Sequence, residues 1–409
     1  MTGRPVLDAD HLLARIAELA GIGAIEGGGC ARLALTDADK DGRDRVAGWM
    51  REAGLAVSID RIGNVIGVRA GTEDGPPVMT GSHIDTVRTG GRYDGNLGVL
   101  AGLEVVRALD ATGRRTRRPV AVAFFTNEEG ARFAPDMMGS LVYVGGLPLD
   151  EALAARSHDG ATVGDELARI GYAGAANVGR PAVAAFVELH VEQGPVLEAE
   201  GVTIGAVDSV QGISWTEIEI EGVSNHAGTT PMRLRHDAGY VAAAIAQAAR
   251  ALASEMGGHQ VATVGSLKLF PDLINVIANR ARLTLDLRNT EEALLRAAEA
   301  RMMRTIAGLA EAEGVTWRAR SLARFEPVAF DPDMVAMVER AARARGRSVR
   351  RMTSGAGHDA QMLARACPTA MIFVPSAGGI SHNVREFTKP EDIAAGAEIL
   401  LDVMLELAG

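Results

Sequence analysis

The first residues whose types and spacing could do chemistry stand in GSHIDTVRTGGRYDGNLG, residues 81–98. His83 and Asp85 are two apart after an apolar run, so on an extended strand their side chains share a face. His83 could then ligate a metal while Asp85 accepts its other ring N–H. Asp94 follows in a glycine-rich loop, where an aspartate is usually a turn former. Alone, these residues fit either a polar turn with a hydrogen-bonded histidine or half of a metal site.

Two adjacent carboxylates form the next candidate cluster. Glu128 and Glu129 stand in TNEEGARF (126–133), directly after the apolar run VAVAFF (120–125). Adjacent carboxylates repel each other unless something cationic lies nearby. Successive side chains of an extended chain also point apart, so one carboxylate can ligate a metal while its neighbour faces a bound water. The alternative is a pair of exposed acids in a loop.

Two histidines follow further apolar runs. His190 lies in ELHVEQGPVLE (188–198), and His382 lies in GISHNVRE (379–386) after AMIFV (370–374). Each histidine alone is more often structural. Four such clusters at four strand ends, however, supply the nitrogen and oxygen donors that zinc, manganese or cobalt accept. Because a carboxylate shared by two ions is an arrangement used in hydrolysis, the pattern favours a metal site.

The elements that must position these clusters alternate along the chain. Continuous apolar strands, such as VMTGS, VAVAFF, AVAAFVEL and AMIFV, are separated by segments with helical spacing. This pattern is typical of a mostly parallel sheet with helices on both faces. In such α/β folds the loops at the carboxyl ends of the strands build the site. We therefore predict an α/β catalytic domain with all four clusters at one edge of its sheet.

The pattern changes between residues 211 and 323. WTEIEIEG (215–222) alternates isoleucine with glutamate, as in a strand with one wet face. The expected elements of this region follow the order β-α-β-β-α-β, which is the ferredoxin-like arrangement. We predict that residues 211–323 form an inserted α+β domain, and that residues 1–210 and 324–409 together form a discontinuous catalytic domain.

Composition and charge exclude several classes of protein. The formal net charge of −10 argues against nucleic acid as a partner. No stretch approaches the roughly 20 apolar residues that a membrane span needs, and the start lacks the pattern of a signal peptide. The two cysteines, Cys30 and Cys367, fit a reducing compartment. We therefore expect a cytoplasmic enzyme that does not contact membranes.

Further polar residues stand outside the four clusters. In SNHAGTTPMRLRHDA, His226 either caps a loop or reaches a catalytic cleft. Asn275 precedes an expected strand and Arg288 ends it, and an arginine can bind a carboxylate through two parallel hydrogen bonds. SGAGHDA contains Gly357 and His358 in a glycine-rich loop suited to close backbone approach to a ligand.

Together these stretches resemble the hydantoinase/carbamoylase family of di-metal amidohydrolases, within the wider aminoacylase and carboxypeptidase-like metallopeptidase group. The matches run in family order from about residue 80 to 385. SNHAGTTPM, ELHxEQGP and SGAGHDA are specific to this family. One departure is INVIANR, where Ala278 stands at a position that is often proline in the family, while Asn275 is kept.

The resemblance implies two divalent metal ions in each subunit, Zn²⁺ or Mn²⁺, with Co²⁺ or Ni²⁺ as alternatives. It implies that Asp94 bridges the two ions. His83 and His190 would complete one site, and Glu129 and His382 the other. The inserted domain would act as a lid and would mediate a homodimer.

The resemblance also assigns roles around the metals. Glu128 would be the general base, and His226 would contribute to catalysis in its own or in the partner subunit's site. The residues expected to contact the substrate are Gln193, His226, Asn275, Arg288, Gly357 and His358.

The implied reaction is hydrolysis of the carbamoyl C–N bond of an N-carbamoyl-L-amino acid. A metal-bridged hydroxide would attack the carbamoyl carbon, and Glu128 would move the proton to the leaving nitrogen. His226 would stabilise the oxyanion, while Arg288 and Asn275 hold the substrate carboxylate. The alternatives are an allantoate or ureidoglycolate-type amidohydrolase, a β-ureidopropionase, a dipeptidase or aminoacylase, and a binding protein without catalysis. The presence of all five ligands and of Glu128 argues against the last.

Overall fold

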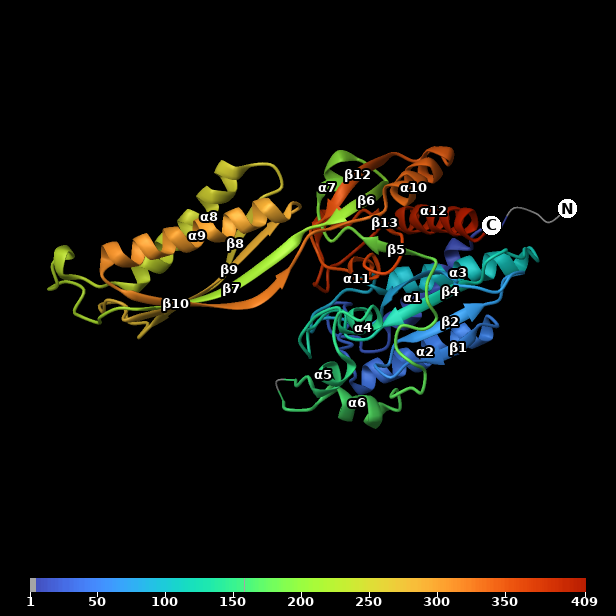
Figure 1. Ribbon diagram of the computed structural model, residues 1–409, viewed down its shortest axis with the longest axis horizontal. Coiled ribbons are helices and arrows are strands. Elements are labelled where there is room, and N and C mark those ends of the chain that lie inside the picture. The colour runs from blue at the N-terminus through green and yellow to red at the C-terminus, as the bar shows by residue number, and fades with distance from the viewer. Residues whose placement is uncertain (1–4, 158) are drawn as a thin grey trace. The chain divides into compact units, whose positions relative to one another are not determined.

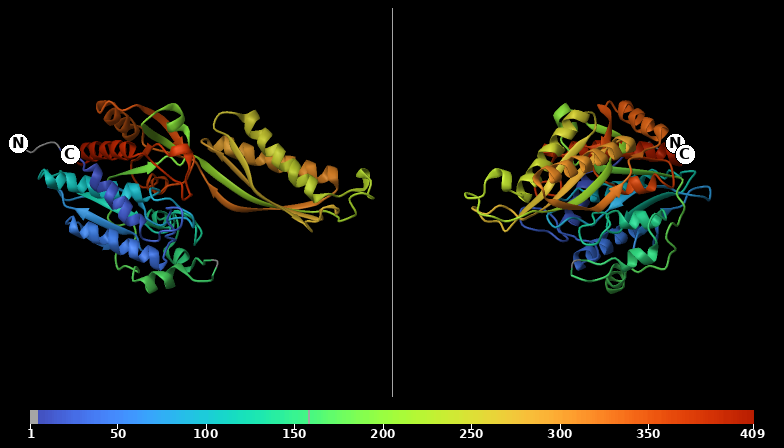
Figure 2. Two further views of the ribbon diagram at one scale, coloured as in Figure 1. Left: turned by 180° about the vertical axis from the view of Figure 1, so that it is seen from behind. Right: turned by 60° about the vertical axis from the view of Figure 1, so that its left-hand side comes forward.

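The computed structural model describes residues 5–157 and 159–409. The chain divides into two compact units, the first comprising residues 1–208 and 329–409 and the second residues 209–328. Figure 1 labels the elements of each unit, and Figure 2 shows them from two further directions.

A mixed sheet forms the centre of the first unit. Its strands run in the order β1-β2-β4-β3-β5-β13-β6-β11, and β12 pairs with β6. The strands are β1 (Ala56–Ile59), β2 (Val65–Arg69), β3 (Val78–His83), β4 (Val120–Phe125), β5 (Ala185–Val191), β6 (Ile204–Val210), β11 (Val328–Ala329), β12 (Val349–Ser354) and β13 (Thr369–Val374). The neighbours β4, β3, β5 and β13 are parallel, whereas β1, β2 and β6 pair antiparallel. The predicted α/β sheet is confirmed, with its parallel strands at the centre.

Helices cover both faces of these central strands. The contacts of two adjacent residues of β5 show this, because neighbouring side chains on a strand point to opposite faces. Leu189 contacts Gly396 of α12 (Pro390–Ala408), while Glu188 accepts the backbone N–H of Ala360 in α11 (Asp359–Leu363). The remaining helices of the unit are α1 (Ala9–Ala20), α2 (Asp37–Glu52), α3 (Asn96–Ala111), α4 (Met138–Tyr143), α5 (Leu149–Ala154), α6 (Val163–Ile170), α7 (Val196–Glu200) and α10 (Pro332–Ala344).

Local sequence explains where several of these elements begin. Asp8, Thr36 and Asp331 accept backbone N–H groups in the first turns of α1, α2 and α10, as N-cap residues do. Every residue of β3, β4, β5 and β13 is buried, which is why these strands read as continuous apolar runs. The polar residues that end these runs are therefore held at a buried edge of the sheet.

The second unit has the predicted ferredoxin-like order. It contains β7 (Gly212–Glu221), α8 (Ala238–Met256), β8 (Val261–Phe270), β9 (Arg280–Asn289), α9 (Glu292–Glu313) and β10 (Thr316–Phe325). The antiparallel sheet runs β10-β7-β9-β8, and both helices lie along one of its faces (Figure 2). Ile218 and Ile220 of β7 are fully buried in the core beneath the helices.

The opposite face of this second sheet carries charged side chains. Glu219 of β7 accepts hydrogen bonds from the guanidinium groups of Arg282 and Arg318 on the two neighbouring strands. This is the wet face that the alternation of WTEIEIEG predicted. No helix in the described part of the chain combines the length and apolar character that crossing a bilayer requires.

Candidate metal centre

The candidate ligands meet at the carboxyl ends of the parallel strands. His83 is the last residue of β3, and Glu128 and Glu129 follow β4 by a few residues. His190 lies near the end of β5, and His382 follows β13. The structure thus brings all four sequence clusters to one edge of the sheet.

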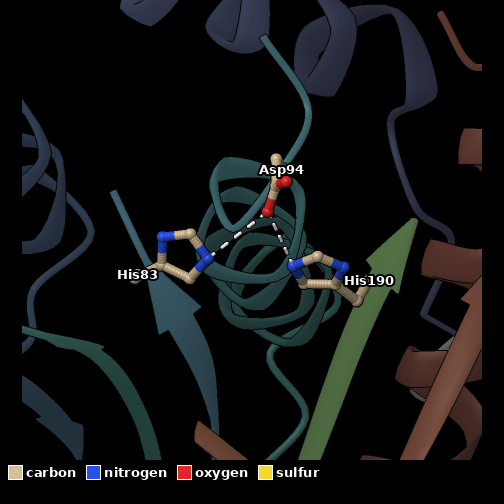
Figure 3. Close-up of side chains that lie close together, drawn as sticks. All are labelled: His83, Asp94 and His190. Carbon is tan, nitrogen blue, oxygen red and sulfur yellow. Dashed lines mark ion pairs between the residues drawn. The ribbon is translucent and has the colours of Figure 1, made fainter. Parts of the chain in front are cut away.

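The first cluster joins two histidines to one carboxylate. The Nε2 atoms of His83 and His190 lie 3.5 and 3.2 Å from Oδ1 of Asp94 (Figure 3). All three side chains are buried, and their ligand atoms lie within 4.8 Å of one another. Gly95 makes this approach possible, because a Cβ at this position would lie 2.5 Å from the His83 ring. The three residues form a set that could hold one metal ion.

The second cluster uses the other oxygen of the same carboxylate. Nε2 of His382 lies 3.4 Å from Oδ2 of Asp94 and 3.2 Å from Oε2 of Glu129. The hydrogen bonds to Asp94 and Glu129 raise the pKa of His382 to about 10. The two carboxylates that attract a proton to this nitrogen would attract a metal ion in the same way. Asp94 is therefore shared between two sets of ligands.

Main-chain carbonyls orient the two buried imidazoles. Nδ1 of His83 lies 2.9 Å from the carbonyl oxygen of Asp85, and Nδ1 of His190 lies 2.8 Å from that of Val191. A carbonyl oxygen only accepts hydrogen bonds, so each Nδ1 carries the proton. In the neutral ring the lone pair is then on Nε2, which faces Asp94. This is the tautomer that a metal ligand at Nε2 requires.

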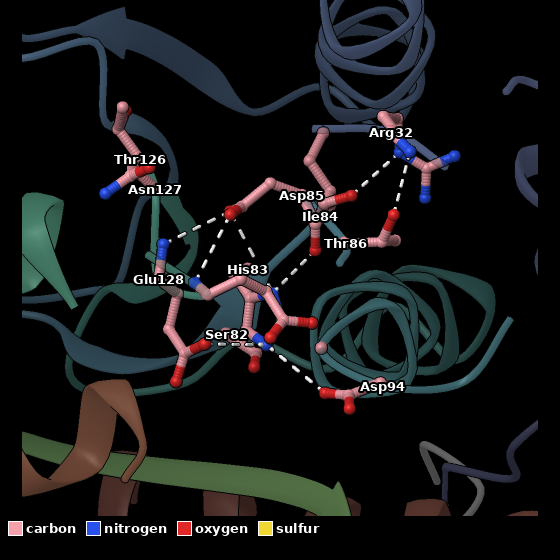
Figure 4. Close-up of polar contacts among 12 residues, drawn as sticks. Arg32, Ser82, His83, Ile84, Asp85, Thr86, Asp94, Thr126, Asn127 and Glu128 are labelled. Carbon is pink, nitrogen blue, oxygen red and sulfur yellow. Dashed lines mark hydrogen bonds and ion pairs between the residues drawn. The ribbon is translucent and has the colours of Figure 1, made fainter. Parts of the chain in front are cut away.

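The expected role of the Asp85 carboxylate is corrected by this geometry. Its Oδ1 lies 3.9 Å from Nδ1 of His83, beyond hydrogen-bonding distance. Instead the two carboxylate oxygens accept the backbone N–H groups of Glu128 and Glu129, each at 3.3 Å (Figure 4). β3 ends at His83, so Asp85 lies beyond the strand and the strand rule that side chains two apart share a face does not apply to it. Asp85 therefore orients the candidate base and its neighbour rather than the histidine.

Glu128 and Glu129 point toward different partners. Oε2 of Glu128 lies 3.4 Å from Nε2 of His83, whereas Glu129 contacts His382. Burial raises the pKa of Glu128 well above its ordinary value, against the opposing charge of His83. Glu128 is thus a buried carboxyl beside the first cluster, and its surroundings increase its affinity for a proton.

The donor set and the surrounding acids fit a divalent cation. Burial raises the pKa of Asp85 to about 6, of Glu386 to about 7 and of Asp359 to about 8. So many buried carboxyl groups resist ionisation unless a cation lies among them. Imidazole nitrogens and carboxylate oxygens at these distances are ligands of zinc and manganese. A third set, Glu188, His190 and His358, also has its ligand atoms within 4.8 Å, but it shares His190 with the first cluster.

Three expected substrate contacts lie in the first unit. Gln193 donates from Nε2 to Oδ2 of Asp94 at 2.8 Å, so it lies at the metal cluster. His358 is fully buried, with Nε2 2.9 Å from Oγ of Ser354 and its ring packed edge-on against His190. Gly357 packs closely against Met137, because a Cβ would lie 2.8 Å from the terminal methyl of that side chain, which would have to shift. The structure therefore places His358 beneath a candidate ligand and not at an open surface.

The other three expected contacts lie in the second unit and do not meet there. His226 and Asn275 are exposed neighbours, since the N–H of Ala227 donates to the Asn275 carbonyl and His226 forms a bridge with Val276. Arg288 lies toward the far end of β9, where it pairs with Asp286 at 2.9 Å. At about 3.4 Å per residue, the length of β9 separates them by roughly 30 Å. One copy of this unit therefore cannot hold a single carboxylate between Asn275 and Arg288.

Sequence reasoning missed several residues of the site. Ser381 donates to Oδ2 of Asp94 at 3.0 Å, and Glu386 accepts the backbone N–H groups of Tyr93 and Asp94. Both stand in or next to the His382 motif, which was the available signal. Arg32 contacts the end of β3 and the Asp94 loop, and no motif in the sequence around Arg32 indicated this.

Comparison with known proteins gives a consistent family. Residues 79–406 match the peptidase family M20/M25/M40. The chain is 42% identical to the N-carbamoyl-L-amino-acid amidohydrolase of Rhizobium meliloti, over 98% of this chain and 97% of that protein. It is 38% identical to the N-carbamoyl-L-amino acid amidohydrolase of Geobacillus stearothermophilus, over 98% and 99% of the two chains. It is 34% identical to the allantoate amidohydrolase of Bacillus subtilis, over 95% of each chain.

Solved structures agree with these relatives. The amidase of the hydantoinase/carbamoylase family from Burkholderia multivorans matches with a TM-score of 0.95 and 44% identity, over 99% of each chain. These similarities confirm the family resemblance that the motifs predicted.

Proposed function

The chain belongs to peptidase family M20/M25/M40, and from this premise we propose that it is an amidohydrolase that cleaves the carbamoyl C–N bond of N-carbamoyl-L-amino acids. The observation that carries the proposal is the carboxylate of Asp94, whose two oxygens face two separate sets of ligands, one buried and one partly open to solvent. The two N-carbamoyl-L-amino acid amidohydrolases described above, similar over nearly their whole length, support this substrate class.

Two divalent ions would occupy the two sets of ligands. His83, Asp94 and His190 would hold one ion, and Asp94, Glu129 and His382 the other. Zn²⁺ or Mn²⁺ fits these donors best, with Co²⁺ or Ni²⁺ as alternatives. When bound, such ions supply Lewis acidity and a water that loses its proton more readily.

Glu128 is the proposed general base. Its carboxylate takes the proton of the attacking water at Oε2 and returns it to the nitrogen that leaves, so the C–N bond breaks without forming an unstable amide anion. Burial, which raises the pKa of Glu128, suits this role because the group must bind and release a proton at the working pH. The hydrogen bond from its backbone N–H to Asp85 holds the residue in place.

The distance between the proposed substrate contacts of the second unit supports a site built from two copies of the chain. His226 and Asn275 lie at one end of β9 and Arg288 toward the other, so a single copy cannot direct all three at one ligand. We propose a homodimer in which one site receives Arg288 from one copy and His226 with Asn275 from the other. Arg288 would bind the substrate carboxylate, and His226 would donate to the oxygen on which negative charge develops.

The test is ammonia release by protein loaded with Mn²⁺ or Zn²⁺. The panel contains N-carbamoyl-L-amino acids, their D-forms, N-carbamoyl-β-alanine, allantoate, ureidoglycolate and N-acetyl amino acids. We expect the highest kcat/KM for N-carbamoyl-L-α-amino acids. Preference for N-acetyl amino acids, or no turnover of any ureido compound, would contradict the proposal.

A second candidate function is supported by the allantoate amidohydrolase of Bacillus subtilis. Allantoate also combines a ureido group with a carboxylate, so the same ligands and the same base could act on it. Preference for allantoate in the panel would favour this function and leave the metal assignments intact.

A further inference from the structure

Arg32 is a fully buried arginine whose guanidinium contacts oxygen atoms of the main chain and of one amide, and the thiol of Cys30. It lies after α1, and its side chain is 0% exposed. Arg43, which is equally buried, pairs instead with the carboxylate of Asp39 at 2.7 Å. Burying a guanidinium against neutral groups is unfavourable unless its hydrogen bonds are nearly all made. The hydrogen bonds of Arg32 therefore show which segments of the chain this side chain holds together.

The guanidinium connects two of the segments that carry candidate metal ligands. Nε donates to the carbonyl of Ile84 at 2.7 Å, directly after His83 (Figure 4). Nη2 donates to Oδ1 of Asn96 at 2.9 Å, two residues after Asp94. Asn96 in turn donates from Nδ2 to the carbonyl of Arg92, two residues before Asp94. One side chain thus bonds to the end of β3 and, through Asn96, to both sides of the Asp94 loop.

The remaining hydrogen bonds anchor Arg32 itself. Nη1 donates to the carbonyls of Leu19 and Ile22 at 2.9 and 2.7 Å, at the end of α1. The Arg32 backbone N–H donates to Oγ1 of Thr86, and the Thr86 N–H donates to the Arg32 carbonyl. Gly42 of α2 leaves just enough room, because a Cβ there would lie 2.7 Å from Cδ of Arg32. The guanidinium is therefore fixed on all sides.

We propose that Arg32 is a positioning residue of the metal centre, which holds the His83 and Asp94 segments at the separation at which both candidate metal sites form. The inference rests on the proposed function, because it concerns the ligands assigned there. Ligand groups must be held to within about 0.5 Å of their working positions, and two loops from different elements do not achieve this without a common support. A lysine cannot replace Arg32, since one ammonium cannot reach Ile84, Leu19 and Asn96 together.

The experiment is a calorimetric titration of the metal-free full-length protein with Mn²⁺. Arg32→Lys keeps the charge and should raise the Kd for Mn²⁺ by about 10- to 100-fold, as loss of a residue that supports a ligand typically does. Arg345→Lys is the matched control, because Arg345 pairs with Asp402 between α10 and α12 and touches none of the ligands. The Tm of each variant is measured in parallel. We expect both to lower the Tm, but only Arg32→Lys to weaken Mn²⁺ binding.

Asn96→Ala provides a second route if Arg32→Lys does not fold. It removes the hydrogen bond beside Asp94 and leaves the other contacts of Arg32 in place, so it should also weaken Mn²⁺ binding. The loss of Mn²⁺ affinity in the double variant should be smaller than the sum of the losses in the two single variants, because both substitutions break the same connection.

The outcomes separate this inference from the function on which it rests. Wild-type protein that binds no Mn²⁺ would contradict the proposed metal-dependent function and the role of Arg32 with it. Wild-type protein that binds Mn²⁺, with the same Kd in Arg32→Lys or, where that variant does not fold, in Asn96→Ala, would overturn the positioning role alone. The positioning role would also be overturned if Arg345→Lys weakened Mn²⁺ binding as much as Arg32→Lys.

Discussion

The two units of the molecule treat glutamate in opposite ways. In the second unit, Glu219 accepts hydrogen bonds from Arg318 and Arg282, which hold the pKa of its carboxyl below the ordinary value. In the first unit, burial raises the pKa of Glu128 well above that value. The two side chains are chemically identical, so their surroundings alone determine whether the pKa rises or falls.

The difference separates structural carboxylates from reactive ones. On the sheet of the second unit, the single charge of Glu219 is already neutralised by arginines on the two neighbouring strands. At the edge of the first sheet, Asp94, Glu128 and Glu129 lie close to three histidines, of which two are buried and one is exposed. Carboxylates that lack fixed cationic partners can bind a metal ion or exchange a proton, whereas a carboxylate that is already paired cannot do so readily.

The largest expected effect comes from removing the charge of the shared carboxylate. Asp94→Asn keeps the size of the side chain but leaves both ligand sets with an amide that binds metals weakly. We expect the Kd for Mn²⁺ to rise by more than about 100-fold, beyond the roughly 10- to 100-fold that loss of a supporting residue causes. Metal content after dialysis, measured by elemental analysis, and ammonia release are the readouts. Retention of both ions by this variant would refute the shared role of Asp94.

Removal of the candidate base should act on catalysis without emptying the metal sites. Glu128→Gln keeps the shape and the backbone hydrogen bond to Asp85 but cannot accept a proton. We expect kcat to fall by about 10²–10⁴-fold while the metal content stays at the wild-type value. Loss of metal from this variant would show that Glu128 is a ligand and not a base.

Asp60 offers a buried carboxylate with a different kind of partner. It accepts the backbone N–H groups of Ile62 and Asn64, and burial raises the pKa of this carboxyl from 3.8 to about 6. Because the folded pKa is the higher one, the folded state binds the proton more tightly than the unfolded state. The stabilising contribution is thus complete below about pH 4 and is lost as the pH rises through about 6.

This pH dependence can be measured against Asp60→Asn, which does not titrate. The free energy of unfolding of the wild type, relative to the variant, should fall by about 2 kcal/mol between pH 4 and pH 7, from urea denaturation followed at each pH. A difference between the two proteins that does not change with pH would show that backbone hydrogen bonds cancel the effect of burial.

The sequence predicts the parts of the molecule that depend on local pattern. Continuous apolar runs identified β3, β4, β5 and β13 because a strand buried on both faces has no polar alternation. The polar residues after these runs were then expected at one edge of the sheet, because parallel strands end on the same side. The wet face of β7 followed from its alternation in the same way.

Residues whose roles depend on distant partners could not be predicted. Arg32 bonds to Ile84 and Asn96, which are 52 and 64 positions away in the sequence, and no periodicity links them. Asp85 was assigned to His83 by strand spacing, but the strand ends at His83, two residues before Asp85, so that rule does not hold there. The separation of Asn275 from Arg288 could not be predicted either. It depends on the length of β9 and on the end of that strand at which the Asn275 loop lies.

The smallest expected effect concerns the arginine-paired carboxylate of the second unit. Glu219→Gln removes a charge that two arginines already neutralise on the outer face of the second sheet, so ammonia release and metal content should not change. Its free energy of unfolding should change little, and less at high salt, because both arginines reach solvent and their ion pairs with Glu219 are screened. Ile218→Ala is the matched control on the opposite face of the same strand, where a fully buried side chain is lost at a cost of about 2–5 kcal/mol. If Glu219→Gln destabilised the protein as much as Ile218→Ala, measured by urea denaturation, then pairing with arginine would not be the reason why this carboxylate is inert.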